Sequence, residues 1–319
     1  MNILLVGPYY GNAKHGAEVG IYNALKELDH NVSVWDYRVG AYLTAEGVKL
    51  QTKDDGFLSE IIKNDACDVV LCPGAGLSDD VLSSPIWKKY KDCLKILWNS
   101  EPIRLENYKG RIEKQKKHFQ MFFTFDQSEI PLYKEMGIQA IWLPQAFNPD
   151  WYKPIPMPVN QRFDGYFVFI GSIGGKWLHR DLFIKKIRSL GYNVNATTIF
   201  DAERVNKAYN MHEAVLNLGL YIAEAGAPEE LLAFGLQQRI FEAIGSCKVC
   251  VTNEIDKKTN NLFTHGENIL FYNNKNLGEV LELASDKNHT RKMEENIENI
   301  RDKHCYKARM ETLLHIIDW

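Results

Sequence analysis

Short apolar runs alternate with amphipathic stretches along the chain, and this alternation predicts the fold. In the first half, six runs are short, rich in β-branched or aromatic residues, and apolar on both faces. They predict strands at Asn2–Val6, Val32–Asp36, Asp68–Cys72, Lys95–Trp98, Phe119–Phe125 and Gln139–Leu143. Because helical patterns fill most of the gaps, we expect a parallel sheet that helices cover on both faces.

The rhythm breaks once, over Asn148 to Gly165, which contains four prolines. Proline lacks the amide donor that a helix interior or a central strand needs, so this segment is the predicted linker. The alternation then resumes, with strands predicted at Tyr166–Ile170, Asn193–Ile199, Val215–Leu220, Lys248–Thr252 and Asn268–Tyr272. The sequence therefore predicts an α/β protein of two Rossmann-like, doubly wound domains facing a cleft: a first domain over 1–150, a linker over 151–164 and a second domain over 165–319.

The end of the chain, from Lys287 to Trp319, has a helical pattern throughout. Its apolar positions indicate that this helical tail packs against another part of the protein: Met310, Leu313, Leu314, Ile316 and Ile317.

Composition narrows the class of protein. The chain has 319 residues, 45% hydrophobic residues and a formal net charge of -3, which suits a soluble protein with two cores. We found no apolar run of the roughly 20 residues that span a bilayer, and no basic segment precedes the first apolar stretch. We therefore expect a cytoplasmic protein without a transmembrane segment. The oligomeric state stays open.

The six cysteines lie mostly in apolar, strand-like segments, which is typical of reduced thiols in a core. Cys247 and Cys250 have the spacing of a metal or redox pair, but no second pair accompanies them. We expect structural thiols and no bound metal.

The first loop that could hold a ligand follows the first predicted strand and runs from Gly7 to Gly20. Gly7, Gly11 and Gly16 would let the backbone approach a ligand closely, with Tyr10 beside them. The glycine spacing is not that of a dinucleotide-binding loop, although Asp36 closes the second strand as a ribose-binding acid would. A Lys-Ser or Lys-Thr pair of a P-loop is also missing, so nicotinamide enzymes and P-loop enzymes are disfavoured.

Two polar side chains on this loop, His15 and Glu18, could take a proton from an attacking hydroxyl. The alternative for each is a solvated residue or a partner for the start of a helix.

The corresponding loop of the second domain is Gly171–Arg180, GSIGGKWLHR. Its glycines, with Ser172, lead into a helix whose first residues include two cations, Lys176 and Arg180. Oriented amide groups, the positive end of a helix dipole and cationic side chains together predict an anion site. The alternative is a flexible turn with solvated cations.

A third signal lies between Phe234 and Glu254, where a short helix ends in glycine and leads into a strand. Arg239 and Glu242 are one turn apart and share a face of this helix. Arginine forks onto phosphate oxygens, and a glutamate accepts hydrogen bonds from a ribose diol, so the pair suits a nucleoside diphosphate. The alternative is a surface salt bridge.

Five segments resemble, in order, the CgeB-like glycosyltransferases of the spore-maturation type, a GT-B family, over nearly the whole chain: residues 122–154, 169–191, 209–219, 239–254 and 265–274. The resemblance implies a GT-B fold with a nucleotide-sugar donor held mainly by the second domain and the acceptor by the first. It places Glu242 on the ribose and Arg239 and Arg180 near the diphosphate. It also implies that no metal or other cofactor is needed, since protein cations and helix dipoles stabilise the leaving diphosphate.

The expected reaction is transfer of a hexosyl or pentosyl group to a hydroxyl or amine. An inverting enzyme needs a general base, for which His15, Glu18 and Glu101 are the candidates, whereas a retaining enzyme has no such requirement. Glu101 could instead cap a turn. Two other classes stay open: a nucleotide-sugar epimerase and a noncatalytic protein that binds nucleotide sugars.

The acceptor is not identified by the sequence. Lysines and arginines concentrate between Lys88 and Lys117, although the whole chain is mildly acidic. A basic face could attract a polyanion such as modified DNA, a teichoic-acid-like polymer or an anionic membrane. The alternative is a solvated helix.

Overall fold

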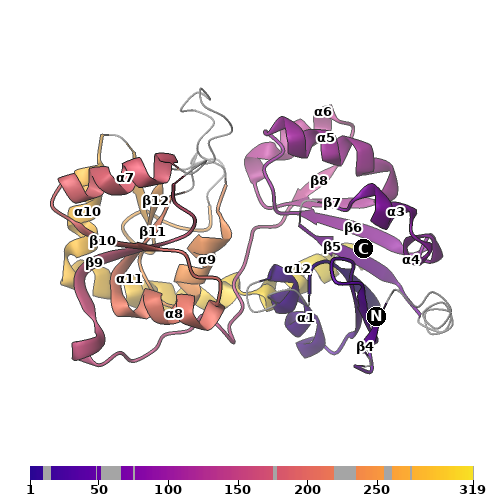
Figure 1. Ribbon diagram of the computed structural model, residues 1–319, viewed down its shortest axis with the longest axis horizontal. Coiled ribbons are helices and arrows are strands. Elements are labelled where there is room, and N and C mark those ends of the chain that lie inside the picture. Colours follow the sequence, from indigo (N-terminus) through magenta and orange to yellow (C-terminus); the bar gives the residue numbers. More distant parts are fainter. Residues whose placement is uncertain are drawn as a thin grey trace. The chain divides into compact units, whose positions relative to one another are not determined.

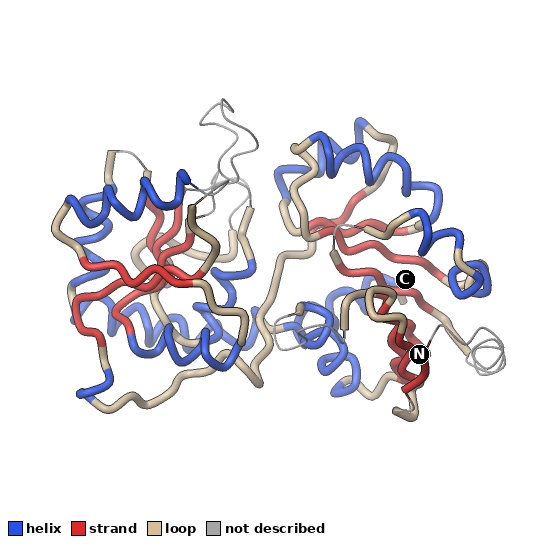
Figure 2. The backbone as a smooth tube through the Cα atoms, in the orientation of Figure 1, coloured by secondary structure: helices blue, strands red, loops and turns tan. Residues whose placement is uncertain are grey.

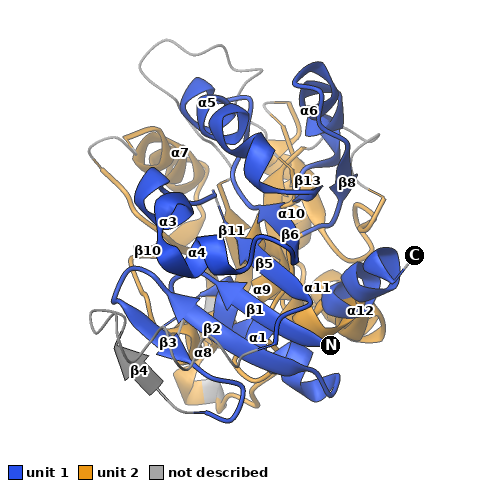
Figure 3. Ribbon diagram, turned by 90° about the vertical axis from the view of Figure 1, so that its right-hand side faces the viewer, with its two compact units in different colours: residues 1–144, 309–319 blue, residues 145–308 orange. Residues whose placement is uncertain are grey.

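The computed structural model describes residues 1–9, 16–47, 49–51, 66–74, 76–174, 178–218, 235–254, 261–273 and 275–318. The chain forms two compact units, shown in different colours in Figure 3. Unit 1 contains Met1–Pro144 and Arg309–Trp319, and unit 2 contains Gln145–Ala308. This division differs from the predicted domains, because the predicted linker belongs to unit 2 and the end of the chain returns to unit 1.

Unit 1 is built on one sheet with strand order β4-β3-β2-β1-β5-β6-β7-β8. Its strands are β1 (Asn2–Val6), β2 (Asn31–Asp36), β3 (Ala41–Leu43), β4 (Lys49–Gln51), β5 (Val69–Pro73), β6 (Leu94–Asn99), β7 (Met121–Thr124) and β8 (Ala140–Trp142). The six neighbouring strands β2, β1, β5, β6, β7 and β8 pair in parallel, as predicted for strands with apolar residues on both faces.

Two strands of unit 1 were not predicted. β3 and β4 add an antiparallel edge to β2. They are only three residues long, too short for a periodic signal. The turn between them uses Gly47, whose φ of 89° lies in the left-handed region that favours glycine.

Helices cover both faces of this sheet, with α1 on one side and α5 and α6 on the other (Figure 1). The helices are α1 (Ala17–Glu27), α3 (Asp79–Ser83), α4 (Pro85–Lys89), α5 (Glu106–Gln115) and α6 (Ile130–Glu135), with short 3-10 turns at Lys116–His118 and Gln127–Glu129. The arrangement confirms the doubly wound topology, with the change of direction between β1 and β5.

Unit 2 has a second, fully parallel sheet with strand order β10-β9-β11-β12-β13. Its strands are β9 (Phe163–Ile170), β10 (Asn193–Thr197), β11 (His212–Asn217), β12 (Cys250–Asn253) and β13 (Leu270–Tyr272). Each strand predicted for this half is present, and Figure 2 shows the strands in red between helices in blue. The change of direction lies between β9 and β11.

The helices of unit 2 are α7 (Leu178–Ser189), α8 (Ala202–Met211), α9 (Gln238–Gly245), α10 (Leu277–Ser285) and α11 (Lys287–Ile300). Two of them begin at an aspartate that accepts from the first turn. Asp201 accepts from the Arg204 amide at 3.0 Å, and Asp286 accepts from the Asn288 amide at 2.9 Å.

The tail is helical, as predicted. After α11, a 3-10 turn at Arg301–His304 leads into α12 (Tyr306–Ile317), which crosses from unit 2 into unit 1. Met310, Leu313 and Leu314 are buried, while Ile316 and Ile317 are half-buried. The prediction that this tail packs is confirmed.

The proline-rich segment is held firmly by unit 2. The Lys153 amide donates to Asn206 Oδ1 at 3.2 Å, and the Ile155 amide donates to Asn210 Oδ1 at 2.9 Å. Arg301 donates to the Tyr152 carbonyl at 3.1 Å. Asparagine side chains thus satisfy the backbone that the prolines prevent from joining a helix or strand.

Candidate donor-binding site

The residues of unit 2 that are predicted to bind the sugar donor lie where the strand order of its sheet reverses. Gly171 follows β9, and Asn217 ends β11, the neighbouring strand. In open parallel sheets, ligands bind outside the carboxyl ends of the strands at this position. Helices α7 and α9 both begin at this end of the sheet, because each follows the carboxyl end of a strand.

The structure brings Arg180 and Arg239 together on one aromatic ring. The Arg239 guanidinium lies 5.4 Å from the centre of the Phe169 ring, and the Arg180 guanidinium lies 5.8 Å from the same centre. Phe169 is itself fully buried on β9. Each contact has the geometry of a cation–π interaction, so one rigid ring holds both charges in place.

Arg239 is further oriented by a chain of hydrogen bonds. Its Nη1 donates to Asn217 Oδ1 at 3.3 Å, and Asn217 Nδ2 donates to Thr252 Oγ1 at 3.0 Å. Asn217 and Thr252 face each other in the register of β11 and β12. The ends of these strands therefore fix the direction of the Arg239 fork.

Gly171 is packed against the same arginine. A Cβ atom at this position would lie 3.0 Å from Phe169 Cζ and 3.1 Å from Arg239 Nη2, closer than side chains tolerate without movement. The loop glycine thus gives room for the guanidinium. The Gly171 amide donates to the Thr197 carbonyl at 2.9 Å, which ties this loop to β10.

Arg180 lies on the inner side of the first turn of α7 and is only 7% exposed. Its Nη1 donates to the Ser172 carbonyl at 3.2 Å. A cation in the first turn of a helix is disfavoured by the helix dipole, and Arg239 has the same position in α9. Two buried or half-buried cations at the positive ends of two helices are an electrostatic cost that a bound anion would offset.

Glu242 lies one turn after Arg239 in α9. Burial raises the pKa of its carboxyl, while the Arg239 charge and the hydroxyls of Tyr152 and Tyr209 oppose that rise. Both tyrosines are buried. Glu242 is therefore held between two phenols and a guanidinium, and its contact with a ribose remains a prediction.

Sequence reasoning missed several residues of this site: Tyr152, Phe169, Tyr209, Asn217 and Thr252. Asn217 and Thr252 carry a usable signal, since each is a polar residue at the carboxyl end of an otherwise apolar strand. Phe169 has no such signal, because an aromatic residue within a buried strand looks like any other core residue. Lys176, which was also predicted to contact the donor, lies outside the described residues.

In unit 1, Glu18 is buried at the start of α1 and folds back over the loop after β1. A Cβ atom on Gly7 would lie 2.9 Å from Glu18 Cγ, and one on Gly16 would lie 2.6 Å from Glu18 Oε2. Burial raises the pKa of Glu18 to about 7, with a small further rise from Asp36 and an opposing effect of Arg38. The structure thus brings together Glu18, Gly7 and Gly16, while Tyr10, Gly11 and His15 lie outside the described residues.

Glu101 follows β6 in a turn that Asn99 organises. Asn99 Oδ1 accepts from the Glu101 amide at 3.2 Å, and Asn99 Nδ2 donates to the Glu101 carbonyl at 2.6 Å. Burial raises the pKa of Glu101, and a hydrogen bond from Tyr108 opposes the rise. Its Oε2 is buried without a hydrogen-bond partner. The Asn99 side chain makes these hydrogen bonds of the turn, and a contact of Glu101 with the acceptor stays a prediction.

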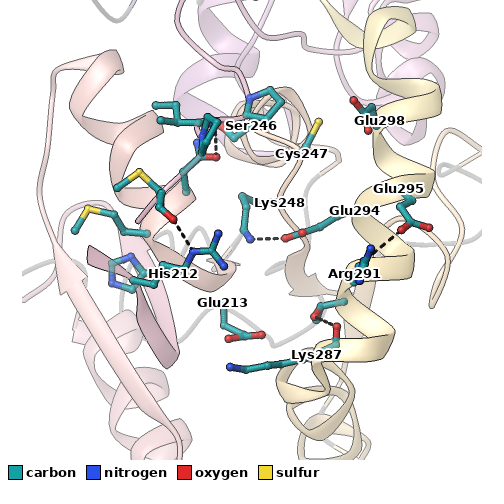
Figure 4. Close-up of a pocket in the computed structure, with 18 residues that line it drawn as sticks. His212, Glu213, Ser246, Cys247, Lys248, Lys287, Arg291, Glu294, Glu295 and Glu298 are labelled. Carbon is teal, nitrogen blue, oxygen red and sulfur yellow. Dashed lines mark hydrogen bonds and ion pairs between the residues drawn. The ribbon is translucent and has the colours of Figure 1, made fainter. Parts of the chain in front are cut away.

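A cavity of about 620 Å³ lies elsewhere in unit 2, at the amino end of the sheet. Figure 4 shows its charged walls, where Lys248 pairs with Glu294 and Arg291 pairs with Glu295 at 3.5 Å. No predicted donor residue lines it. Four acids and four lysines or arginines line it, and two of the acids are ion-paired, so the strand-end site is the better candidate for the chemistry.

Two features are absent from the described residues. These residues contain no helix long and apolar enough to cross a membrane. Nor do they contain a group of three or more His, Cys, Asp or Glu side chains placed to hold a metal ion.

Comparison with known proteins agrees with the fold. Residues 158–315 match the model of a family described as glycosyl transferase-like. The search of curated proteins found no match.

Solved structures resemble the whole chain. An alpha-glucosyltransferase in complex with UDP-glucose and DNA containing an abasic site has a TM-score of 0.61 at 10% identity, covering 98% of this chain and 99% of that one. Sucrose-phosphate synthase from Thermosynechococcus elongatus has a TM-score of 0.65 at 9% identity, covering 100% of this chain and 98% of that one. Anabaena Alr3699/HepE, in complex with UDP and glucose, has a TM-score of 0.60 at 12% identity, covering 99% of both chains.

Two parallel α/β units with a returning terminal helix define the GT-B fold. The family match covers most of unit 2, which holds the two arginines, and the first residues of the segment that returns to unit 1. Residues 158–315 match a glycosyl transferase-like family and the whole chain has the GT-B fold, so the protein is a glycosyltransferase.

Proposed function

We propose that the protein belongs to the CgeB-like type and transfers a sugar from a uridine diphosphate sugar, with Arg180 and Arg239 binding the diphosphate. The observation that supports this most is the pair of guanidinium groups on the Phe169 ring at the carboxyl end of the sheet. Two of the similar structures contain UDP or UDP-glucose, which suggests uridine as the base.

In the proposed reaction, an acceptor oxygen or nitrogen attacks the anomeric carbon and the bond to the diphosphate breaks. Negative charge then develops on the leaving phosphate. Arg180 and Arg239, with the amides at the starts of α7 and α9, are placed to stabilise that charge without a metal ion. Because Phe169 and Asn217 already hold the fork of Arg239, little reorganisation accompanies the reaction.

The test is a thermal-shift panel of uridine, guanosine, thymidine and cytidine diphosphates with EDTA present. We expect uridine diphosphate to raise the melting temperature most, and Arg239→Ala to abolish the shift without lowering the melting temperature of the free protein. A protein that no diphosphate stabilises would contradict the donor site. Release of diphosphate only when an acceptor is added would separate a transferase from an epimerase or a binding protein.

Glu18 is the proposed general base if the reaction inverts the anomeric centre. A base is most effective when its pKa lies near the working pH, and burial raises the pKa of Glu18 to about 7. Glu101 is the second candidate, because its pKa is also raised and its Oε2 is buried without a hydrogen-bond partner.

Exposed lysines of unit 1 indicate the chemical class of the acceptor. Lys114 and Lys117 are exposed at the end of α5 and in the following 3-10 turn, whereas Lys116 pairs with Glu113 at 2.6 Å. A similar structure holds DNA. We therefore propose a polyanion, with DNA as the first candidate, and expect its affinity to fall steeply with salt.

The salt dependence provides the test. Lys114→Ala with Lys117→Ala should reduce the slope of log affinity against log salt by about 2. Lys116→Ala serves as the matched control and should change it less, since Glu113 already neutralises that charge. A slope that is equal in all three proteins would exclude this face.

A further inference from the structure

Exposed apolar side chains gather on one part of unit 2. The described residues include eight large hydrophobic side chains that are exposed, and five of them fall between residues 173 and 200. These are Ile173, Leu178, Leu182, Leu190 and Phe200, with exposed fractions of 41%, 54%, 56%, 48% and 70%. Scattered surface leucines need no explanation, but a cluster within one helix and its flanking loops does.

Helix α7 accounts for most of this cluster. Leu178 and Leu182 are one turn apart and share its exposed side, while Ile184 and Ile187 are buried on the opposite side. Leu190 follows the end of the helix. Figure 1 shows α7 on the outer surface of unit 2, with no described helix of that unit over it.

The same face of the helix is basic. Lys185, Lys186 and Arg188 are exposed on its last turns. The one acid of the helix, Asp181, pairs with Lys185 at 3.3 Å. The helix therefore carries a local positive charge in a chain whose formal net charge is -3.

Exposed leucines beside lysines distinguish a protein partner from a lipid bilayer. The central parts of protein interfaces are depleted of lysine, because its strongly hydrated charge resists burial. A helix that lies on an anionic bilayer combines the two types: apolar side chains enter the boundary of the acyl chains, and lysines reach the phosphate groups beside them.

We propose that the exposed face of α7, formed by Leu178, Leu182, Lys185, Lys186 and Leu190, docks unit 2 onto the surface of an anionic lipid bilayer. The docking is peripheral and reversible. Arg180 projects from the opposite side of the same helix toward Phe169, so the docked face leaves the candidate diphosphate site on the inner side of α7. The proposal does not depend on the sugar donor or the acceptor.

The experiment is vesicle flotation at low salt, with phosphatidylcholine vesicles and with vesicles in which a third of the lipid is phosphatidylglycerol. We expect binding only to the anionic vesicles. Leu178→Ser with Leu182→Ser should weaken that binding more than tenfold, because the apolar anchor is lost. Lys185→Gln with Lys186→Gln should weaken it at least about fivefold, from about 1 kcal/mol for the Lys186 charge near the surface, with a smaller share from Lys185 because Asp181 already pairs with it.

The matched control replaces Lys207 and Lys292, which are exposed on α8 and α11, with glutamine. This variant loses the same net charge and should bind anionic vesicles as the native protein does. Because all of these side chains are exposed, each variant should keep the native melting temperature.

Three results would overturn the proposal. The native protein could fail to float with anionic vesicles, or the leucine variant could bind them as well as the native protein. In the third, light scattering would show that the native protein is a dimer and the leucine variant a monomer, with no vesicle binding by either. That outcome would make the α7 face an interface between copies of the chain.

Discussion

Replacing Arg239 with lysine tests whether the fork of this guanidinium, and not its charge alone, binds a diphosphate. Lysine keeps the positive charge but has no planar fork. It also loses the bond to Asn217 Oδ1 at 3.3 Å and the planar contact with Phe169 at 5.4 Å.

The size of the effect follows from those contacts. A hydrogen bond to a charged group contributes about 1.5–3 kcal/mol, and lysine can restore one of the two bonds that arginine makes to a phosphate. The net loss is about 2 kcal/mol, which corresponds to a roughly 30-fold weaker complex. Stability should change little, because lysine keeps the charge in the first turn of α9 and so leaves its interaction with the helix dipole as it was.

Isothermal titration of Arg239→Lys with uridine diphosphate and with uridine measures this. The nucleoside should bind equally to the native protein and to the variant, because it has no phosphate. Arg204→Lys, at an exposed position on α8, is the control and should leave both affinities unchanged. If the diphosphate binds the variant within threefold of the native affinity, or if uridine binding falls equally, the assignment of Arg239 to the diphosphate is refuted.

Three further predictions concern Gly171, Glu18 and Glu242. Gly171→Ala should weaken nucleotide binding about tenfold, because its Cβ would lie 3.1 Å from Arg239 Nη2. Gly278→Ala in α10 is the control, since its Cβ would have nothing within 4 Å. This variant should bind nucleotide normally and gain up to about 1 kcal/mol of stability. Glu18 has a pKa of about 7 in the folded protein, against an ordinary value of 4.5. Between these two pH values the folded protein keeps the proton of Glu18, while the unfolded chain loses it. The contribution of Glu18 to the free energy of unfolding therefore falls as pH rises from 4.5 to 7. Chemical denaturation should show Glu18→Gln gaining about 3 kcal/mol relative to the native protein across this window, and a constant difference between the two would contradict the buried carboxyl. Glu242→Gln should weaken the binding of UDP and leave the binding of inorganic diphosphate unchanged, as measured by titration. An equal loss of affinity for both ligands would mean that Glu242 supports Arg239 and does not contact the ribose.

The parallel strands and their order along the chain could be predicted because buried parallel strands are continuous apolar runs, whereas the short antiparallel strands β3 and β4 could not. The boundary between the units could not. Prolines at 149 to 158 indicate only that a segment leaves regular structure, and here Asn206 and Asn210 hold that segment on unit 2. The return of α12 to unit 1 has no signal either, since Met310, Leu313 and Leu314 indicate burial but not the partner.

The candidate site shows the same limit. Arg180, Arg239 and Gly171 could be predicted because cations and glycines at the starts of helices are chemically distinctive. The two arginines lie against the buried ring of Phe169, and the polar ends of β11 and β12 hold Arg239. Those contacts depend on the order of the strands in the sheet, which residues distant in sequence determine. A sequence therefore identifies candidate anion-binding groups before it identifies the groups that orient them.

The orientation has an energetic consequence for the free protein. Two guanidinium groups that share one ring repel each other, and both oppose the dipole of the helix that carries them. Phe169 and Asn217 stabilise this arrangement only in part, so the free site stores unfavourable electrostatic energy. In the proposed site, a diphosphate bound with its negative charges between the two arginines would remove that repulsion. The charge that develops on the leaving phosphate would increase the same attraction further, so the proposed arrangement would stabilise the transition state more than the bound donor.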